Sequence, residues 1–139
     1  MKILRYDSFP SYAKEIREAV FIKEQGFESE FDEIDNMAVH FVLFDEDESP
    51  IGTCRVFWNN EMSAYTLGRL AVIKEYRGRN IGSLIVKEVE KYVRKTGGKC
   101  IVLHAQCQVR TFYNKLGYKE FGDIEEEQGC PHIWMGKLV

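Results

Sequence analysis

A short turn rich in glycine and arginine constrains the fold more than any other feature of this sequence. The turn reads Tyr-Arg-Gly-Arg-Asn-Ile-Gly over residues 76–82; it follows a β-rich run at 64–73 and overlaps helical apolar spacing over 80–95. A strand pattern over residues 100–105 that is apolar apart from His104 comes next. Two strands joined by one helix form a β-α-β unit, whose crossover makes the strands parallel. We therefore expect a parallel strand pair in the middle of the sheet.

The same turn is suited to hold an anion. The first turn of a helix leaves backbone N–H groups without intrahelical partners and carries the positive end of the helix dipole. The sequence contains neither the G-x-x-x-x-G-K-[ST] phosphate loop nor the G-x-G-x-x-G dinucleotide fingerprint. The backbone of residues 77–82 is thus expected to bind an anion in a different arrangement.

The other segments predict antiparallel strands and two further helices. β-rich runs predict strands at 2–7, 38–44, 51–58, 118–121 and 132–138, and apolar periodicity predicts helices at 8–26 and 109–116, with residues 28–35 as a loop or short helix. Gly68, inside the strand at 64–73, indicates a bulge or a close backbone approach. At 139 residues and 45% hydrophobic composition, the chain is expected to form a single domain, 1–139. The predicted class is α/β, with a mixed, mostly antiparallel sheet, a central β-α-β unit and flanking helices.

Charge and composition exclude several kinds of partner. The formal net charge is −3, with basic and acidic residues mixed along the chain, so we expect no nucleic acid. No apolar run approaches the length of a membrane span, and the first residues do not resemble a signal peptide, so we expect no membrane and a cytoplasmic protein. The four cysteines form no C-x-x-C pair, so we expect no metal site.

Three segments together resemble motif A and the following region of the GNAT superfamily of N-acetyltransferases. They are Leu70-Ala71-Val72, the Arg77-x-x-Asn80-x-Gly82 turn, and Phe112-Tyr113-Asn114-Lys115-Leu116-Gly117 after the next strand. The N-terminal half is similar, more loosely, to small single-domain bacterial acetyltransferases. The resemblance implies a GNAT-like acyl-CoA N-acyltransferase fold with acetyl-CoA as cosubstrate.

The resemblance also assigns the residues that bind acetyl-CoA. It implies contacts from Leu70, Ala71 and Val72 to the pantetheine arm, and from Arg77, Gly78, Arg79, Asn80, Ile81, Gly82 and Ser83 to the pyrophosphate. Asn80 stands where the family motif has a glycine. Asn tolerates a left-handed backbone and can cap a helix through its side-chain oxygen, so the turn is expected to keep its shape.

Acetyl transfer to an amine needs an acid for the leaving thiolate and a base for the amine. By resemblance Tyr113 donates the proton; the alternative is that Tyr113 is a core aromatic beside Phe112. The candidate bases are Glu24, Glu28, Asp35, His104 and His132, of which we favour His132 and Glu28.

The leading hypothesis is an acetyl-CoA-dependent N-acetyltransferase. The acceptor is a small-molecule amine or a protein amino group that attacks directly in a ternary complex, and a homodimer is left open. A second hypothesis is a catalytically weak CoA-binding sensor or interaction domain of the same fold. A third is a structural α/β domain with a fortuitous turn. Acetyl-CoA binding separates the third from the others, and amine-dependent thiol release separates the first two.

Overall fold

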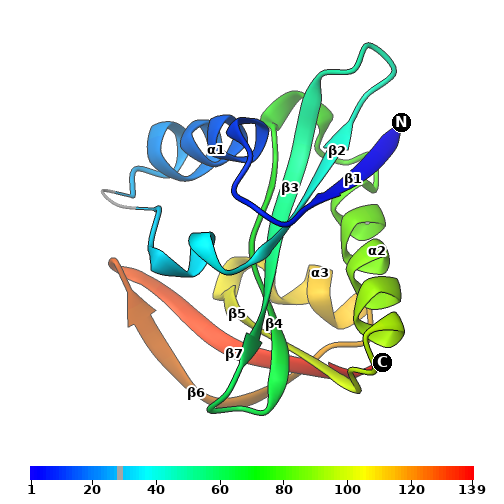
Figure 1. The fold of residues 1–139 in the computed structure, drawn as a ribbon. Coiled ribbons are helices and arrows are strands. Elements are labelled where there is room, and N and C mark those ends of the chain that lie inside the picture. The colour runs from blue at the N-terminus through cyan, green and yellow to red at the C-terminus, as the bar shows by residue number, and fades with distance from the viewer. Residues whose placement is uncertain (28–29) are drawn as a thin grey trace.

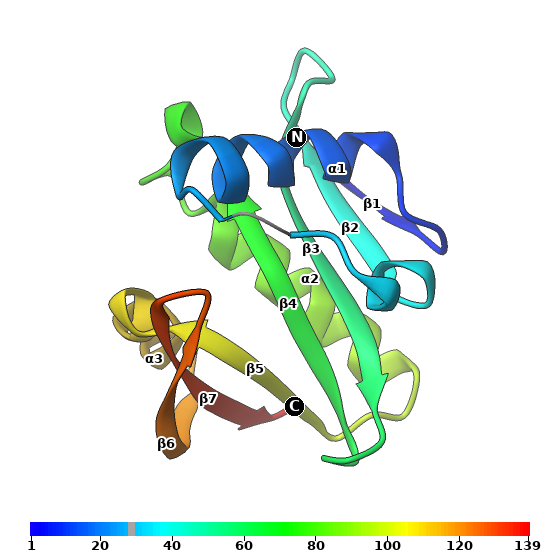
Figure 2. The same ribbon diagram turned by 90° about the vertical axis from the view of Figure 1, so that its left-hand side faces the viewer.

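The computed structural model describes residues 1–27 and 30–139, and its centre is one seven-stranded sheet (Figures 1 and 2). The strand order is β1-β2-β3-β4-β5-β7-β6. The bounds are β1 Lys2–Tyr6, β2 Val39–Phe44, β3 Pro50–Asn59, β4 Ala64–Val72, β5 Cys100–Gln106, β6 Lys119–Glu127 and β7 Cys130–Leu138. Only β4 and β5 are parallel, as the β-α-β pattern predicts, and every other neighbouring pair is antiparallel. The predicted mixed, mostly antiparallel sheet is confirmed.

Helices cover both faces of this sheet. On one face lie α1, Ser11–Arg17, and the π-helical segment η1, Glu18–Glu24, which continues it. On the other lie α2, Ile81–Lys95, and α3, Arg110–Lys115 (Figure 2). The short 3₁₀ segments are η2 Glu33–Asn36, η3 Lys74–Tyr76 and η4 Cys107–Val109. Among the described residues, no helix has the length and apolar character needed to cross a membrane.

The alternating side chains of β2 explain why the sheet has two cores. Phe41 and Leu43 belong to the cluster that α2 covers, whereas Val42 and Phe44 belong to the cluster under α1. Successive strand residues point to opposite faces, so a strand that is buried on both sides reads as an unbroken apolar run. This accounts for the continuous apolar sequence of residues 41–44.

The bulge expected near Gly68 lies in β4. Thr53 pairs with Ala71 and Arg55 pairs with Gly68, so β4 has one more residue than β3 across this interval. Arg69 within it has a left-handed backbone, with φ of 53°. A bulge re-aims side chains and ends regular pairing, and it lies here beside the open part of the sheet.

The C-terminal hairpin is longer than predicted. β6 extends to Glu127 rather than ending at 121, and β7 begins at Cys130 rather than at 132. The sequence pattern missed the extension because β6 is an exposed edge strand rich in acidic residues, and edge strands carry charge to avoid pairing with other chains. Gln128 and Gly129 both have positive φ, as the two-residue turns favoured in hairpins require.

Candidate active site

Strands β4 and β5 separate after a short paired stretch, and this separation opens the site. Their register contains only Tyr65 with Ile101 and Thr66 with Val102. Beyond these pairs the strands diverge, and the main cleft, of about 680 Å³, lies between the end of β4, the 76–83 turn, and α3. The edge of β4 that faces β5 is therefore available to an extended ligand from Leu67 onward.

The structure brings nearly all of the predicted cofactor residues to this cleft. Nine of the ten line it: Leu70, Ala71, Val72, Arg77, Gly78, Asn80, Ile81, Gly82 and Ser83. The exception is Arg79, whose guanidinium lies over the Tyr76 ring, 5.0 Å from its centroid. Lys115 also lines the cleft. It is a cation to which the sequence analysis gave no role, although it lies inside the quoted motif.

The turn has the backbone shape that was expected for it. Asn80 precedes α2 with φ of 62° and ψ of 19°, and the first helical hydrogen bond runs from Leu84 N–H to its carbonyl oxygen at 3.1 Å. The Asn80 side chain makes no capping hydrogen bond, so the capping part of the prediction is wrong. The amides of residues 81–83 precede that first bond, and they remain donors at the positive end of a 15-residue helix.

Gly82 lies at a close approach between two helices. A Cβ atom at this position would lie 3.1 Å from Cζ of Phe112 in α3. Gly78 instead faces open space. Glycine is favoured there because φ is 79°, in the left-handed region that other residues seldom adopt. The two glycines thus serve packing and turn shape respectively.

Arg77 is anchored within the protein. Its guanidinium pairs with both carboxylate oxygens of Glu24, at 2.5 and 2.7 Å, and donates to the Val72 carbonyl at 3.0 Å. The hydrogen bonds from Arg77 lower the pKa of Glu24. Glu24 is therefore a poor proton acceptor, and the pair connects η1 to the turn.

Tyr113 lies where the main cleft meets a second cavity. It lines both the cleft and a neighbouring cavity of about 140 Å³, and these also share Leu70 and Gln106. Tyr113 is 7% exposed, and burial raises the pKa of its phenol. It makes no hydrogen bond to any other described residue, so its neutral hydroxyl is available to a ligand.

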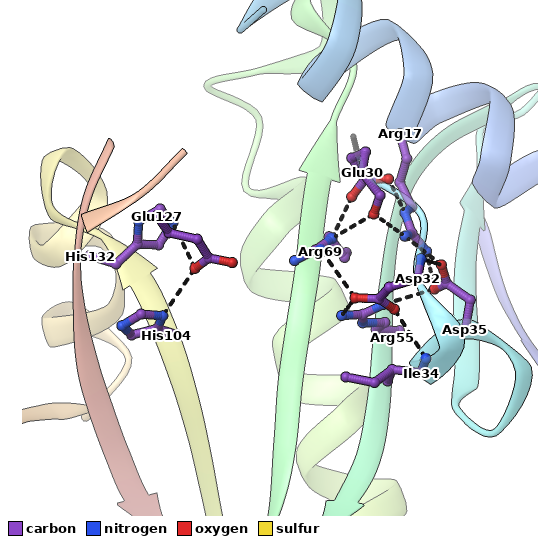
Figure 3. A network of polar contacts seen from close by, with 10 residues as sticks. All are labelled: Arg17, Glu30, Asp32, Ile34, Asp35, Arg55, Arg69, His104, Glu127 and His132. Atoms are coloured by element: carbon purple, nitrogen blue, oxygen red, sulfur yellow. Dashed lines mark hydrogen bonds and ion pairs between the residues drawn. The ribbon is translucent and has the colours of Figure 1, made fainter. Parts of the chain in front are cut away.

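The second cavity contains both candidate histidines. His104 on β5 and His132 on β7 line it, with ring centroids 5.0 Å apart. Glu127 at the end of β6 reaches both rings: its Oε2 is 3.2 Å from His104 Nδ1 and 3.8 Å from His132 Nε2 (Figure 3). The sequence alone does not single out Glu127, because nothing in an acidic run distinguishes one member from the next.

Two further candidate bases remain, Asp35 and Glu28. Asp35 accepts hydrogen bonds from Arg17 and Arg55 (Figure 3); although burial acts in the opposite direction, these bonds lower its pKa to about 2. A carboxylate held in this way does not take protons near neutral pH. Glu28 lies outside the described residues.

The hydrogen bonds of His132 fix its tautomer. Nδ1 is 2.8 Å from the Cys130 carbonyl oxygen. A carbonyl only accepts hydrogen bonds, so Nδ1 carries the hydrogen in the neutral ring, and Nε2 presents a lone pair. A proton added at Nε2 would face the Glu127 carboxylate.

Comparison with known proteins identifies the family. Residues 10–139 match the model of the acetyltransferase (GNAT) domain. The chain is 37% identical over 125 residues to YjcF of Bacillus subtilis (strain 168), an uncharacterized N-acetyltransferase, covering 88% of this chain and 87% of that one. This chain belongs to the GNAT acetyltransferase family, which confirms the resemblance seen in the sequence.

Solved structures agree on the fold. A protein of Lactobacillus plantarum assigned as an N-acetyltransferase superposes with a TM-score of 0.90 at 27% identity, over 99% of this chain and 97% of that one. An aminoglycoside 6'-N-acetyltransferase complexed with coenzyme A superposes with a TM-score of 0.73 at 20% identity, over 99% and 97% of the two chains. The likeness to the second protein shows the fold alone.

Proposed function

We propose that this acetyltransferase moves the acetyl group of acetyl-CoA to an amine acceptor by direct attack in a ternary complex. The observation that carries the proposal is the pair of cavities that share Leu70, Gln106 and Tyr113. One cavity has the predicted cofactor residues and the other has the histidines. Donor and acceptor can therefore meet beside Tyr113 without a covalent intermediate on the protein.

The cleft suits a CoA thioester in three respects. The unpaired amides of residues 81–83 and the nearby Lys115 match a pyrophosphate. The free edge of β4 from Leu67 to Val72 can pair with the amides of a pantetheine arm. A backbone N–H on that edge can also stabilise a tetrahedral oxyanion, a contact worth about 3 kcal/mol in other enzymes.

The proton transfers are assigned to two side chains. His132 Nε2 accepts a proton from the acceptor ammonium, Glu127 stabilises the imidazolium that results, and the neutral amine then attacks the thioester. The Tyr113 hydroxyl donates its proton to the departing thiolate, and the nitrogen of the tetrahedral intermediate gives its second proton to the tyrosinate, so that Tyr113 ends neutral. Because burial raises the pKa of Tyr113, its phenol keeps its proton until the thiolate forms.

A covalent route through a cysteine has less support. Burial raises the pKa of Cys54, and it also raises the pKa of Cys130. Neither cysteine lines the cleft or the second cavity. A thiol nucleophile needs a lowered pKa and access to substrate, so direct attack is the simpler route.

Calorimetry and thiol release together test the proposal. We expect acetyl-CoA to bind with saturation, and an amine panel to release CoA thiol. Tyr113→Phe should lower kcat about a hundredfold, within the usual range for loss of a general acid, with acetyl-CoA affinity nearly unchanged. Tyr12→Phe, on exposed α1, is the matched control and should leave kcat unchanged.

Two results would overturn the proposal in different ways. Saturable binding without amine-dependent thiol release would favour the CoA sensor. No binding at millimolar acetyl-CoA would leave only the fold.

A further inference from the structure

Arg69 has an unusual position, partly buried but facing the second cavity. It lies at the β4 bulge with φ of 53°, in a backbone region that non-glycine residues seldom occupy. Such conformations cost energy and concentrate at functional sites. The side chain is 26% exposed, and it lines both the cavity that contains His104 and a smaller adjoining one of about 40 Å³.

The contacts of Arg69 leave part of its guanidinium unused. Nε contacts the Glu30 carboxylate at 2.5 Å and the Glu30 carbonyl at 3.2 Å, and Nη2 lies 3.5 Å from Asp32. Among the residues that the structure describes, Nη1 has no hydrogen-bond partner. A buried guanidinium normally pairs in two parallel bonds with a carboxylate, as Arg55 does with Asp32 at 2.6 and 3.1 Å.

The two carboxylates beside Arg69 also accept hydrogen bonds from other arginines. Glu30 accepts from Arg17 at 2.7 Å, and Asp32 accepts from Arg55 (Figure 3). Burial lowers the pKa of Arg69, and the positive charge of Arg55 lowers it further. Of these three guanidiniums, Arg69 has the fewest short contacts with carboxylates, so it can still donate a hydrogen bond to a further acceptor.

The wall of the smaller cavity opposite Arg69 has a carboxylate and an imidazole. Glu127 and His132 line it together with Arg69, and Figure 3 shows Glu127 lying on the side of the site that faces Arg69. A carboxylate and an unprotonated imidazole nitrogen suit an ammonium group. The cavity thus has the Arg69 guanidinium, paired with Glu30, on one wall and a carboxylate and an imidazole on the other.

We propose that the acceptor is a zwitterionic amino acid whose carboxylate binds Arg69 while its ammonium faces His132 and Glu127. This inference rests on the proposed function and names its substrate class. Arg69 and His132 line both the second cavity, of about 140 Å³, and the smaller adjoining one that Glu127 lines, and the two together suit a small molecule of this kind. The substrate carboxylate supplies a hydrogen-bond acceptor for Nη1 of Arg69. His132 then takes a proton from the ammonium group, and the neutral amine attacks the thioester.

Matched acceptors test the proposal on the unmodified protein. Each amino acid of a panel is compared with its carboxamide and with its decarboxylated amine, by thiol release and by calorimetric titration of the CoA-loaded protein. We expect amino acids to be acetylated with kcat/KM about tenfold to a hundredfold above both analogues, the range expected for a charge-assisted pair.

Variants of Arg69 show whether this residue carries the preference. Arg69→Lys keeps the charge beside Glu30 but loses the planar fork, and Arg69→Gln loses both. We expect either change to raise KM for amino acids about tenfold or more, with KM for decarboxylated amines and the affinity for acetyl-CoA nearly unchanged. Arg94→Gln, on the exposed last turn of α2, is the control that should change neither.

Three outcomes would overturn the inference. One is faster acetylation of amines or peptides than of free amino acids, and a second is an equal loss for both acceptor classes in Arg69→Lys. The third is CoA-loaded protein that neither binds nor acetylates any amino acid. Saturable acetyl-CoA binding with thiol release from another amine would leave the proposed function intact in each case.

Discussion

His132 illustrates how one backbone contact can prepare a side chain for chemistry. The Cys130 carbonyl holds the Nδ1 hydrogen, so the lone pair is on Nε2, on the side of Glu127. His104, in contrast, has Nδ1 near Glu127 and Nε2 3.3 Å from Glu125, and its ring stacks on Trp134. Both nitrogens lie near carboxylates of β6, although Nε2 makes no hydrogen bond to any residue that the structure describes. The two histidines share a cavity, but their surroundings favour His132 as the base.

Replacing His132 should slow the reaction in a manner that depends on pH. Because the acceptor amine must lose its proton, we expect His132→Asn to lower kcat about a hundredfold at neutral pH. The residual rate should rise with pH as the amine deprotonates in solution. Rate profiles from pH 6 to 10 measure this.

His104→Asn is the paired variant, since it removes the neighbouring ring and leaves the Cys130 contact in place. We expect a smaller loss of kcat and a profile shaped like that of the unmodified protein. A larger loss in His104→Asn than in His132→Asn would reverse the assignment.

The turn before α2 contains two residues, separated by one other residue, whose backbone has a positive φ. Gly78 and Asn80 both have positive φ, and together they direct the chain so that α2 begins with its amides facing the cleft. Asn80 achieves this without a side-chain cap. The structural role of the missing family glycine is therefore taken over by the tolerance of Asn for left-handed geometry.

A pair of glycine variants separates turn shape from general stability. Gly78 and Gly97 have φ of 79° and 85°, and both face open space. Gly78→Ala and Gly97→Ala should each destabilise the protein by about 1 kcal/mol, since alanine disfavours this region. Only Gly78→Ala should also weaken acetyl-CoA binding, by about tenfold, because the turn amides move. Urea unfolding and calorimetry measure the two effects, and equal affinities in both variants would contradict the role of the turn.

At the scale of the molecule, one buried charge cluster joins the N-terminal segments to the sheet. Arg17 ends α1, Asp35 lies in η2, and Arg55 and Arg69 project from β3 and β4 (Figure 3). Arg17, Asp35 and Arg55 are each less than 5% exposed. Buried charges of this kind are costly unless every partner is present, so the cluster fixes one arrangement of these elements.

Asp35 makes the stability of the whole protein dependent on pH in the acid range. Its pKa is about 2 in the folded protein, against 3.8 as the reference value. A lowered carboxyl pKa stabilises the folded state above the unfolded value, so this contribution, about 2 kcal/mol, is present above about pH 4 and is lost as the pH falls toward 2. Urea unfolding between pH 5 and pH 2.5 should show this loss.

Asp35→Asn should remove this part of the pH dependence, and it should destabilise the protein at neutral pH by about 3 kcal/mol, because Arg17 and Arg55 lose their shared partner. Asp47→Asn, in the exposed loop before β3, should stay within about 0.5 kcal/mol of the unmodified protein. The same pH dependence in both variants would contradict the assignment to Asp35.

The β-α-β unit and the turn were predictable from the sequence alone, and nine of the ten residues expected to contact acetyl-CoA line the main cleft. These depend on local patterns, such as apolar periodicity, glycine positions and a helix start, which a single stretch of chain contains. The position of Tyr113 followed from the same contiguous motif. The residues of this motif follow one another around the cleft in the same order as in the sequence.

The tertiary structure was needed to find the neighbours of His132, which the sequence offered only as a candidate base. Arg69, His132 and Glu127 come from β4, β7 and β6, and they line one cavity because β4 and β5 diverge. It also removed Asp35 and Glu24 from the candidate bases by pairing them with arginines distant in sequence. Contacts between residues distant in sequence determine which charged side chains are already paired and which can still bind a ligand. No local sequence pattern contains this information.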